Sequence, residues 1–256
     1  MKKSFWELFF LFAYLFVGVW FSFVFEVNLL VSLFVLYLSP VLYFSYVDKK
    51  RIKDFLIFSI LFGLVFGIIV DYIGHVTKIW EIHSAFSFKI FGFVSIELLV
   101  WSFLVVYYAL LFYNHFFGIR RTLNIKLLCY FCFTSLGIFL LLYFFLPSLL
   151  YLPYFYTIFG VSLIVLPLAL SIMTFSHDTI GKLFLTQLYF SILNLAHEYI
   201  GLKLNLWTFA GKQYLGWINL PGIQVPFEEF FFWICLGTYA IVTIFFLLSK
   251  ETKKGK

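Results

Sequence analysis

Five of the carboxylic acids in this sequence stand where they could perform acid–base chemistry. The chain has only 12 Asp and Glu among 256 residues, and these five flank two long segments between apolar runs: Asp71, Glu97, Glu198, Glu228 and Glu229. Apolar surroundings disfavour the ionised form of a carboxyl group. A crowded set can therefore hold a protonated acid beside an ionised base. The pattern predicts general acid–base catalysis.

The acids belong to a motif that occurs twice. The tetrapeptide DYIG at 71–74 is followed by Trp80, and EYIG at 198–201 is followed by Trp207 at the same distance from its acid. The second acids of the two copies are Glu97 and Glu228. The interval between the second acids exceeds that between the first acids by four, so the second copy is slightly longer. The matching order predicts an internal duplication.

Helical spacing indicates which way these side chains point. Four polar residues at intervals of 4, 3 and 4 share one face of a helix and should face the protein interior. They are Gln187, Ser191, Asn194 and Glu198. Asp71 follows Gly63 and Gly67 at intervals of four, and small residues let another helix approach closely. Asp71 is therefore expected to point inward as well.

Glu228 and Glu229 are adjacent, so only one of them can point fully inward. Glu228 shares a helical face with Phe232, whereas Glu229 shares one with Trp233. Glu228 also matches Glu97 in the duplication, which favours it as the primary acid. The expected site is a cavity between the two halves. Its expected walls include the following residues: Trp80, Trp207, Asn194, Gln187 and Phe232.

The composition sets the surroundings of this site. The chain is 64% hydrophobic and 12% charged, with 39 Phe, whereas soluble domains are about half apolar and a quarter charged. These values exclude a soluble globule, a disordered chain and a nucleic-acid-binding protein. Three cysteines do not make a disulfide framework. We therefore expect an all-α polytopic membrane protein.

Eight stretches are long enough to cross a bilayer, which takes about 20 mainly apolar residues. Their ranges are 5–24, 29–47, 55–73, 95–114, 126–146, 152–175, 180–201 and 227–248. Four helices per copy preserve orientation, so the prediction is two parallel four-helix repeats. The first repeat is 1–120, with its motif at 71–101, and the second is 121–256, with its motif at 198–233.

The basic residues predict the orientation in the membrane. Of 18 Lys and Arg, all but four fall on one side of this arrangement, together with both termini. The four exceptions are Lys78, Lys89, Lys203 and Lys212. Because basic residues collect in cytoplasmic loops, we expect an integral protein of the cell membrane with both termini in the cytoplasm.

The sequence lacks the motifs that several other kinds of catalytic or binding site require. His197-Glu198 begins like a zinc-protease H-E-x-x-H motif, but position 201 is Gly. No phosphate-binding loop, dinucleotide fingerprint or Cys/His cluster is present. The expected site therefore uses no cofactor and no metal. The nearby histidines, His75, His83 and His197, are interpreted as structural, and pairing of the acids with loop lysines is the structural alternative.

These residues together resemble the integral-membrane lycopene cyclase domain family. The resemblance is carried by Glu198, by Trp207 and Phe209, and by the segment PFEEF at 226–230. The family pattern is an acid, a Trp and Pro-x-Glu-Glu-Phe, duplicated. Here the first copy departs from it, with Ser95-Ile96-Glu97-Leu98 in place of the Pro and the second Glu. The matched segments cover about a quarter of the chain.

The resemblance implies a cofactor-free cyclisation of an acyclic carotenoid end group to an ionone ring. Glu228 or Glu229 would protonate the terminal alkene, and Asp71, Glu97 or Glu198 would complete the pair. The implied partners are a hydrophobic polyene within the bilayer, membrane lipid and other carotenoid-pathway enzymes. Two alternatives are a related polyene-modifying enzyme such as a hydratase, and a non-enzymatic isoprenoid-binding membrane protein.

Overall fold

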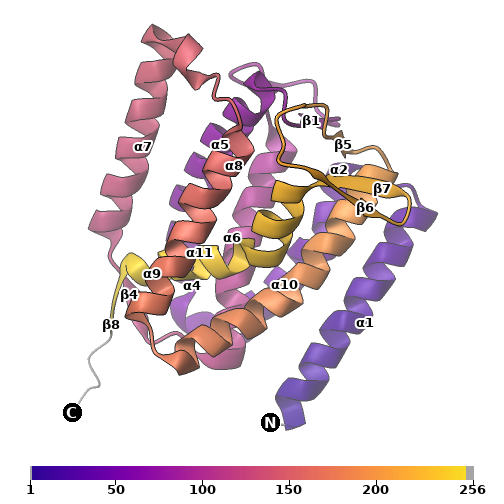
Figure 1. The fold of residues 1–256 in the computed structure, drawn as a ribbon. Helices are drawn as coiled ribbons and strands as arrows, with labels where there is room; N and C mark the ends of the chain where they lie inside the picture. The colour runs from indigo at the N-terminus through magenta and orange to yellow at the C-terminus, as the bar shows by residue number, and fades with distance from the viewer. Residues whose placement is uncertain (1, 252–256) are drawn as a thin grey trace.

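The computed structural model describes residues 2–251, which form a bundle of long helices with short strands at its two ends (Figure 1). The first half contains α1 (Lys2–Val24), α2 (Leu29–Leu33), η1 (Phe34–Leu38), α3 (Ser39–Val47), η2 (Lys49–Arg51), α4 (Ile52–Phe58), η3 (Ser59–Leu64), α5 (Val65–Val76) and α6 (Ile96–Phe117). The second half contains α7 (Ile125–Phe145), η4 (Pro147–Leu150), α8 (Phe155–Gly160), η5 (Val161–Val165), α9 (Leu166–Thr174), α10 (His177–Lys203), η6 (Glu229–Ile234) and α11 (Cys235–Leu247).

Seven helical segments are long and apolar enough to cross a membrane. They are Phe5–Val24, Leu29–Val47, Lys49–Val76, Ile96–Phe117, Ile125–Phe145, Phe155–Thr174 and Glu229–Leu247. The chain is thus a helical polytopic membrane protein, as the composition predicts. The eighth expected span, 180–201, lies within α10. That helix has 27 residues, but its polar stripe and charged first turns keep it outside this apolar set.

Two helices form the centre of the bundle. Two thirds of the Glu229–Leu247 segment (67%) and 61% of Ile96–Phe117 are buried, against 17% of Ile125–Phe145 and 22% of Phe5–Val24. In Figure 1, α7 and α1 accordingly stand at opposite edges, with α6 and α11 between them. The exposed aromatic side chains of α1 and α7 are those expected on surfaces that face lipid.

Two π-helical segments occupy corresponding places in the two halves. η1 begins at Phe34 and η5 begins at Val161. Each is followed by a proline, Pro40 or Pro167, in the first turn of the next α-helix. Proline lacks the N–H that continues the helical ladder, so a wider turn before it accommodates the loss. The interval between the two π-helical segments equals that between the first acids of the two motifs.

Two long connections link helices at one end of the bundle, one between α5 and α6 and the other between α10 and η6. Short strands pair the two connections with each other. β1 (Glu81–Ile82) pairs antiparallel with β5 (Trp207–Thr208), which joins one connection to the other. Each connection also forms a hairpin, β2 (Lys89–Ile90) with β3 (Val94–Ser95), and β6 (Trp217–Leu220) with β7 (Ile223–Pro226). The sequence predicts loops here, not strands.

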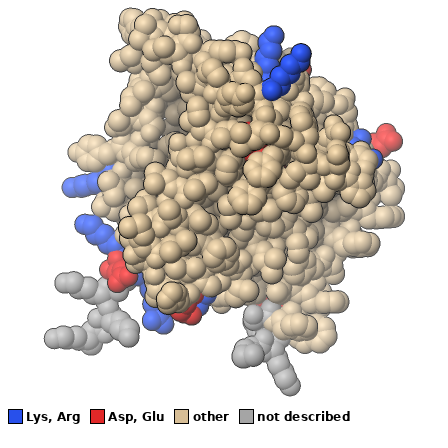
Figure 2. All heavy atoms as spheres, in the orientation of Figure 1, with Lys and Arg blue, Asp and Glu red and all other residues tan. Residues whose placement is uncertain are grey.

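The connections and the chain ends lie at opposite ends of the bundle. β4 (Arg121–Leu123) pairs with β8 (Ser249–Glu251), and Figure 1 shows this pair towards the same end as the start of α1, away from β1, β5, β6 and β7. Figure 2 shows charged side chains at the margins of the molecule, with a broad, nearly uncharged area between them. This distribution suits a protein embedded in a bilayer.

Candidate acid–base site

A deep cavity lies between the two halves of the chain and holds about 1290 Å³ of space between atoms, its open mouth included. Its walls come from η3, α5 and α6 on one side, and from α8, η5, α10, η6 and α11 on the other. Most of the lining is apolar or aromatic. Five of the expected site residues line it: Trp80, Asn194, Glu198, Trp207 and Glu229. The other five, Asp71, Glu97, Glu228, Gln187 and Phe232, lie outside its lining.

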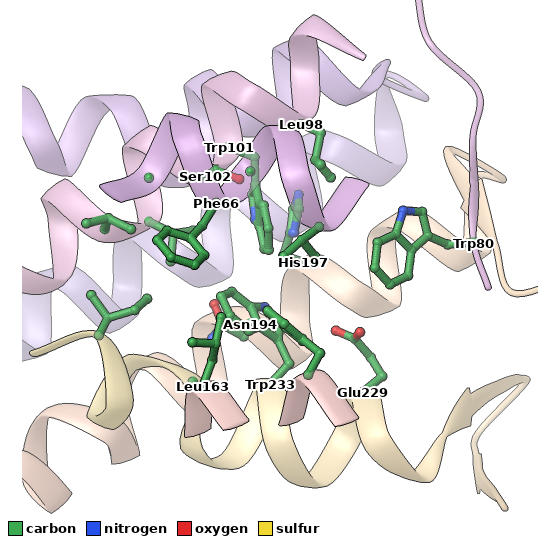
Figure 3. Close-up of a pocket in the computed structure, with 18 of the residues that line it drawn as sticks. Phe66, Trp80, Leu98, Trp101, Ser102, Leu163, Asn194, His197, Glu229 and Trp233 are labelled. Atoms are coloured by element: carbon green, nitrogen blue, oxygen red, sulfur yellow. The ribbon is translucent and has the colours of Figure 1, made fainter. Parts of the chain in front are cut away.

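Glu229 is the acid that faces this space without a partner. It begins η6 at the floor of the cavity, and only 7% of the residue is exposed. Figure 3 shows its carboxyl directed into the open space between Trp80 and Trp233. The structure gives its carboxyl no hydrogen bond or ion pair from any described residue. Both members of the adjacent pair are buried, but Glu229, and not Glu228, is the one that lines the cavity.

The first acid of each motif is held by the tryptophan that follows it. Trp80 Nε1 donates to Asp71 Oδ1 at 2.9 Å, and Trp207 Nε1 donates to Glu198 Oε1 at 3.0 Å. Asp71 also accepts the backbone N–H of Ser95 through Oδ2, at 3.1 Å. Both Asp71 carboxylate oxygens are thus engaged, whereas the second oxygen of Glu198, at the cavity wall, has no hydrogen bond from any described residue.

Glycine makes these contacts possible. A Cβ atom on Gly74 would overlap the indole of Trp80, and one on Gly201 would overlap that of Trp207. Each glycine carbonyl also accepts a backbone N–H from the connection, Ile79 to Gly74 at 2.8 Å and Leu206 to Gly201 at 2.7 Å. The glycine of each motif therefore leaves the space in which the tryptophan ring lies.

The second acid of each motif accepts a backbone hydrogen bond from the connection that precedes it in the chain. Glu97 accepts from the backbone N–H of Ala85 at 2.7 Å and from the hydroxyl of Ser84 at 2.8 Å. Glu228 accepts from the backbone N–H of Leu215 and the hydroxyl of Thr157, both at 2.8 Å. Backbone N–H groups without a partner are costly to bury. These two acids therefore stabilise the loops.

Gln187 and Phe232 lie beside the cavity and support the chain that carries Glu229. Gln187 Nε2 donates to the carbonyl of Ile234 at 2.9 Å, and its Oε1 accepts the N–H of Tyr239 at 2.8 Å. These backbone groups lie where the π-turn of η6 passes into α11. Phe232 packs against Gly160, where a Cβ would overlap its ring.

Three polar residues of the cavity wall form a cluster on one side. Tyr37 Oη donates to Asn194 Oδ1 at 3.3 Å, and the Tyr37 and His197 rings meet edge to face at 5.2 Å. Asn194 Nδ2 and His197 Nε2 are buried and have no hydrogen-bond partner in the part of the chain that the structure describes. The sequence interpretation treats His197 as structural and does not consider Tyr37. The place of His197 next to Glu198 in the sequence is the signal that could have identified it as a site residue.

Aromatic rings make up much of the remaining wall. Trp101 and Trp233 approach across the two halves, with ring centroids 5.1 Å apart. Trp80 meets Tyr156 edge to face at 5.3 Å. Trp101 and Trp233 have no place in the expected site. Their faces carry the negative part of the ring quadrupole, which attracts cations.

A tyrosine outside the membrane-spanning segments links the two connections by a hydrogen bond. Tyr214 Oη donates to the carbonyl of Ile79, which joins the second connection to the first. Burial raises the pKa of the Tyr214 phenol above its ordinary value. The hydroxyl therefore keeps the proton that this hydrogen bond requires.

The structural alternative, in which the five motif acids form ion pairs with loop lysines, is not what the described residues show. The structure has ion pairs between Glu7 and His115, between Arg121 and Glu251, and between Asp178 and Lys182, and none of these three includes a motif acid. Indole, hydroxyl and backbone donors take that place for four of the acids. Comparison of the chain with protein-family models, curated proteins and solved structures finds no match.

Proposed function

We propose that this protein is an integral-membrane enzyme that cyclises the end group of an acyclic carotenoid by acid–base chemistry, without a cofactor. The observation that carries the proposal is the carboxyl of Glu229, which has no partner among the described residues and projects into a largely apolar, aromatic cavity. The resemblance of residues 198–233 to the lycopene cyclase domain family supports the choice of substrate.

Glu229 has the surroundings of a proton donor. Burial among apolar groups disfavours the carboxylate relative to the neutral acid. A neutral carboxyl has one O–H to give, and no hydrogen bond within the described residues competes for it. The four other motif acids accept hydrogen bonds, so each of them already has a donor from the protein.

The reaction needs only transfer of a proton and movement of alkene electrons. Glu229 gives its proton to the inner CH carbon of the terminal trisubstituted double bond, which leaves a tertiary cation on the outer carbon that carries the two methyl groups. The next double bond of the chain attacks that cation, which closes a six-membered ring and moves the charge into it. Loss of a ring proton then forms the ring double bond, so the product is an isomer of the substrate.

The aromatic wall suits the cationic intermediates. Trp80, Trp101 and Trp233 line the same cavity as Glu229. A cation near an indole face gains about 0.5–2 kcal/mol, and more where water is excluded. The apolar lining also limits water, which would otherwise capture the cation as an alcohol.

The proposal includes the duplicated architecture. We treat the chain as eight helices in two parallel repeats, with α10 as the eighth, and with both termini in the cytoplasm. Three paired features support this arrangement: the acid–tryptophan contacts, the loop-closing acids and the matched π-helical segments. The cavity would then open to a polyene dissolved in the bilayer.

The test is expression of the whole protein in a host that accumulates lycopene, with pigments separated by chromatography. The proposal predicts monocyclic or bicyclic carotenoids of unchanged mass. Unchanged lycopene, with the protein shown to be inserted in the membrane, would contradict a cyclase acting on it. A hydroxylated product would identify a hydratase instead, and binding of lycopene without conversion would identify a carrier.

A further inference from the structure

His197 is a buried, unpaired titratable group in the cavity. The residue is 6% exposed, its ring lines the cavity, and its Nε2 has no hydrogen-bond partner. Within residues 2–251, no hydrogen bond is made by its other ring nitrogen either. Figure 3 shows the imidazole near Trp101, across the open space from Glu229. Buried polar groups normally have partners, so this one is available for a ligand.

We infer that the imidazole of His197 is the base that removes the ring proton after cyclisation. This inference rests on the proposed function, in which Glu229 supplies the first proton. The C–H bond of the cyclised cation breaks, its electron pair forms the ring double bond, and the proton moves to the ring nitrogen of His197. The proton then returns from the imidazolium to the Glu229 carboxylate, which restores both groups.

A neutral acid and a neutral base suit this cavity better than two carboxyl groups. Isolated charges are costly to bury in apolar surroundings. With Glu229 protonated and His197 neutral, the two groups carry no charge in the resting site. After the two proton transfers they become an anion and a cation, which attract each other until the proton returns.

The ring of His197 is also placed to carry a positive charge for a short time. Its centroid lies 5.2 Å from that of Tyr37 and 5.0 Å from that of Trp207. Aromatic rings within about 6 Å of a cation stabilise it through their quadrupoles. These two rings also fix the orientation of the imidazole, so the base would reach the same carbon of the substrate in each turnover.

Of the four other motif carboxylates, Glu198 is the one that lines the cavity and could compete for this role. Asp71, Glu97 and Glu228 lie outside the cavity lining and accept hydrogen bonds from the connections. Glu198 does line the cavity, but its Oε1 accepts from Trp207 Nε1 at 3.0 Å. Removal of that carboxylate would therefore disturb the indole that also packs on His197.

Comparison of the two halves places acid and base in the same half. When the two copies of the motif are aligned on their acids, Leu98 takes the place of Glu229 and Val70 takes the place of His197. Both Leu98 and Val70 line the cavity. The first half thus has apolar side chains at both positions, which indicates that the two reactive groups function as a pair and that the cavity holds one reactive centre.

The experiment measures which ring forms, because the site of proton loss decides the position of the ring double bond. Wild-type protein, His197→Gln and His197→Phe are purified, reconstituted in liposomes that contain lycopene, and assayed for rate and ring isomers. His197→Phe keeps an aromatic ring between Tyr37 and Trp207. His75→Gln, on the face of α5 that stacks on Phe93, is the matched control, and Glu198→Gln tests the competing base.

We expect wild type and His75→Gln to give one ring isomer. Both His197 variants should lose about 100-fold in rate, and their residual product should be a mixture of isomers. Wild-type rate and isomer pattern in both His197 variants would overturn the inference. A mixture of isomers from Glu198→Gln, with a single isomer from both His197 variants, would overturn it as well. No cyclisation by the wild type would instead contradict the proposed function.

Discussion

Two indole N–H groups fasten the connections to the helices, and each one partners a buried carboxylate. Trp207→Phe would remove the hydrogen bond at Glu198 Oε1 while keeping an aromatic ring. A buried acceptor left without its partner costs about 1–3 kcal/mol, and more for a charged group. We expect a lower free energy of unfolding by that amount in detergent. Trp20→Phe, on the exposed surface of α1, should change it little; equal losses in both variants would contradict this account.

The glycine beneath each indole gives a second prediction. Gly201→Ala would force a Cβ into the ring of Trp207, and such overpacking costs about 1–3 kcal/mol. Gly181, in the same helix, has open space at its Cβ position. Gly181→Ala should therefore be neutral or stabilise the protein by up to about 1 kcal/mol. Thermal unfolding of the two variants compares them, and a stable Gly201→Ala protein would count against close packing of the tryptophan.

The sequence identifies the important acids but not their separate roles. Their types, spacing and duplication point to one region of the molecule, and the structure brings all five to the cavity or the connections beside it. Glu228 and Glu229 show the limit of what can be predicted from the sequence. A regular helix does not say which of two neighbours faces inward, and the π-turn that begins at Glu229 alters the helical phase beyond it.

Among the helices, the η6–α11 segment depends on a side chain from α10. Gln187 satisfies Ile234 and Tyr239 where the hydrogen-bond pattern changes. Gln187→Leu would leave both backbone groups without this partner, at about 1–3 kcal/mol for each unsatisfied group. We expect a less stable protein with slower turnover, because the segment that carries Glu229 loses support.

Leu185→Ala, on the lipid-facing side of the same helix, is the control for Gln187→Leu. Its stability and turnover should stay close to those of the wild type. Comparable stability of Gln187→Leu and Leu185→Ala would show that the amide does not hold the π-turn.

The apolar helices are predictable because their length and composition alone determine them. The strands in the connections are not, because β1 pairs with β5 from the other half of the chain and neither stretch has strand-like alternation. The polar stripe of α10 is found from its spacing. The same stripe lowers the hydropathy of that helix, which separates it from the seven apolar segments.

For the molecule as a whole, the distribution of basic residues predicts the orientation in the membrane. In a protein whose three cysteines are replaced by Ser, Lys212→Cys should react with a membrane-impermeant maleimide added outside intact cells. Lys50→Cys should react only after the membrane is permeabilised. The reverse labelling pattern would contradict cytoplasmic termini.

The most direct measurement compares Glu229→Gln with wild type in a lycopene-accumulating host, with Glu81→Gln, an exposed residue of β1, as a matched control at equal membrane insertion. Gln keeps the shape of the side chain but has no acidic proton. The account predicts cyclic carotenoids from wild type and Glu81→Gln, and at least about 100-fold less from Glu229→Gln. Cyclic products formed by Glu229→Gln at the wild-type rate would contradict it.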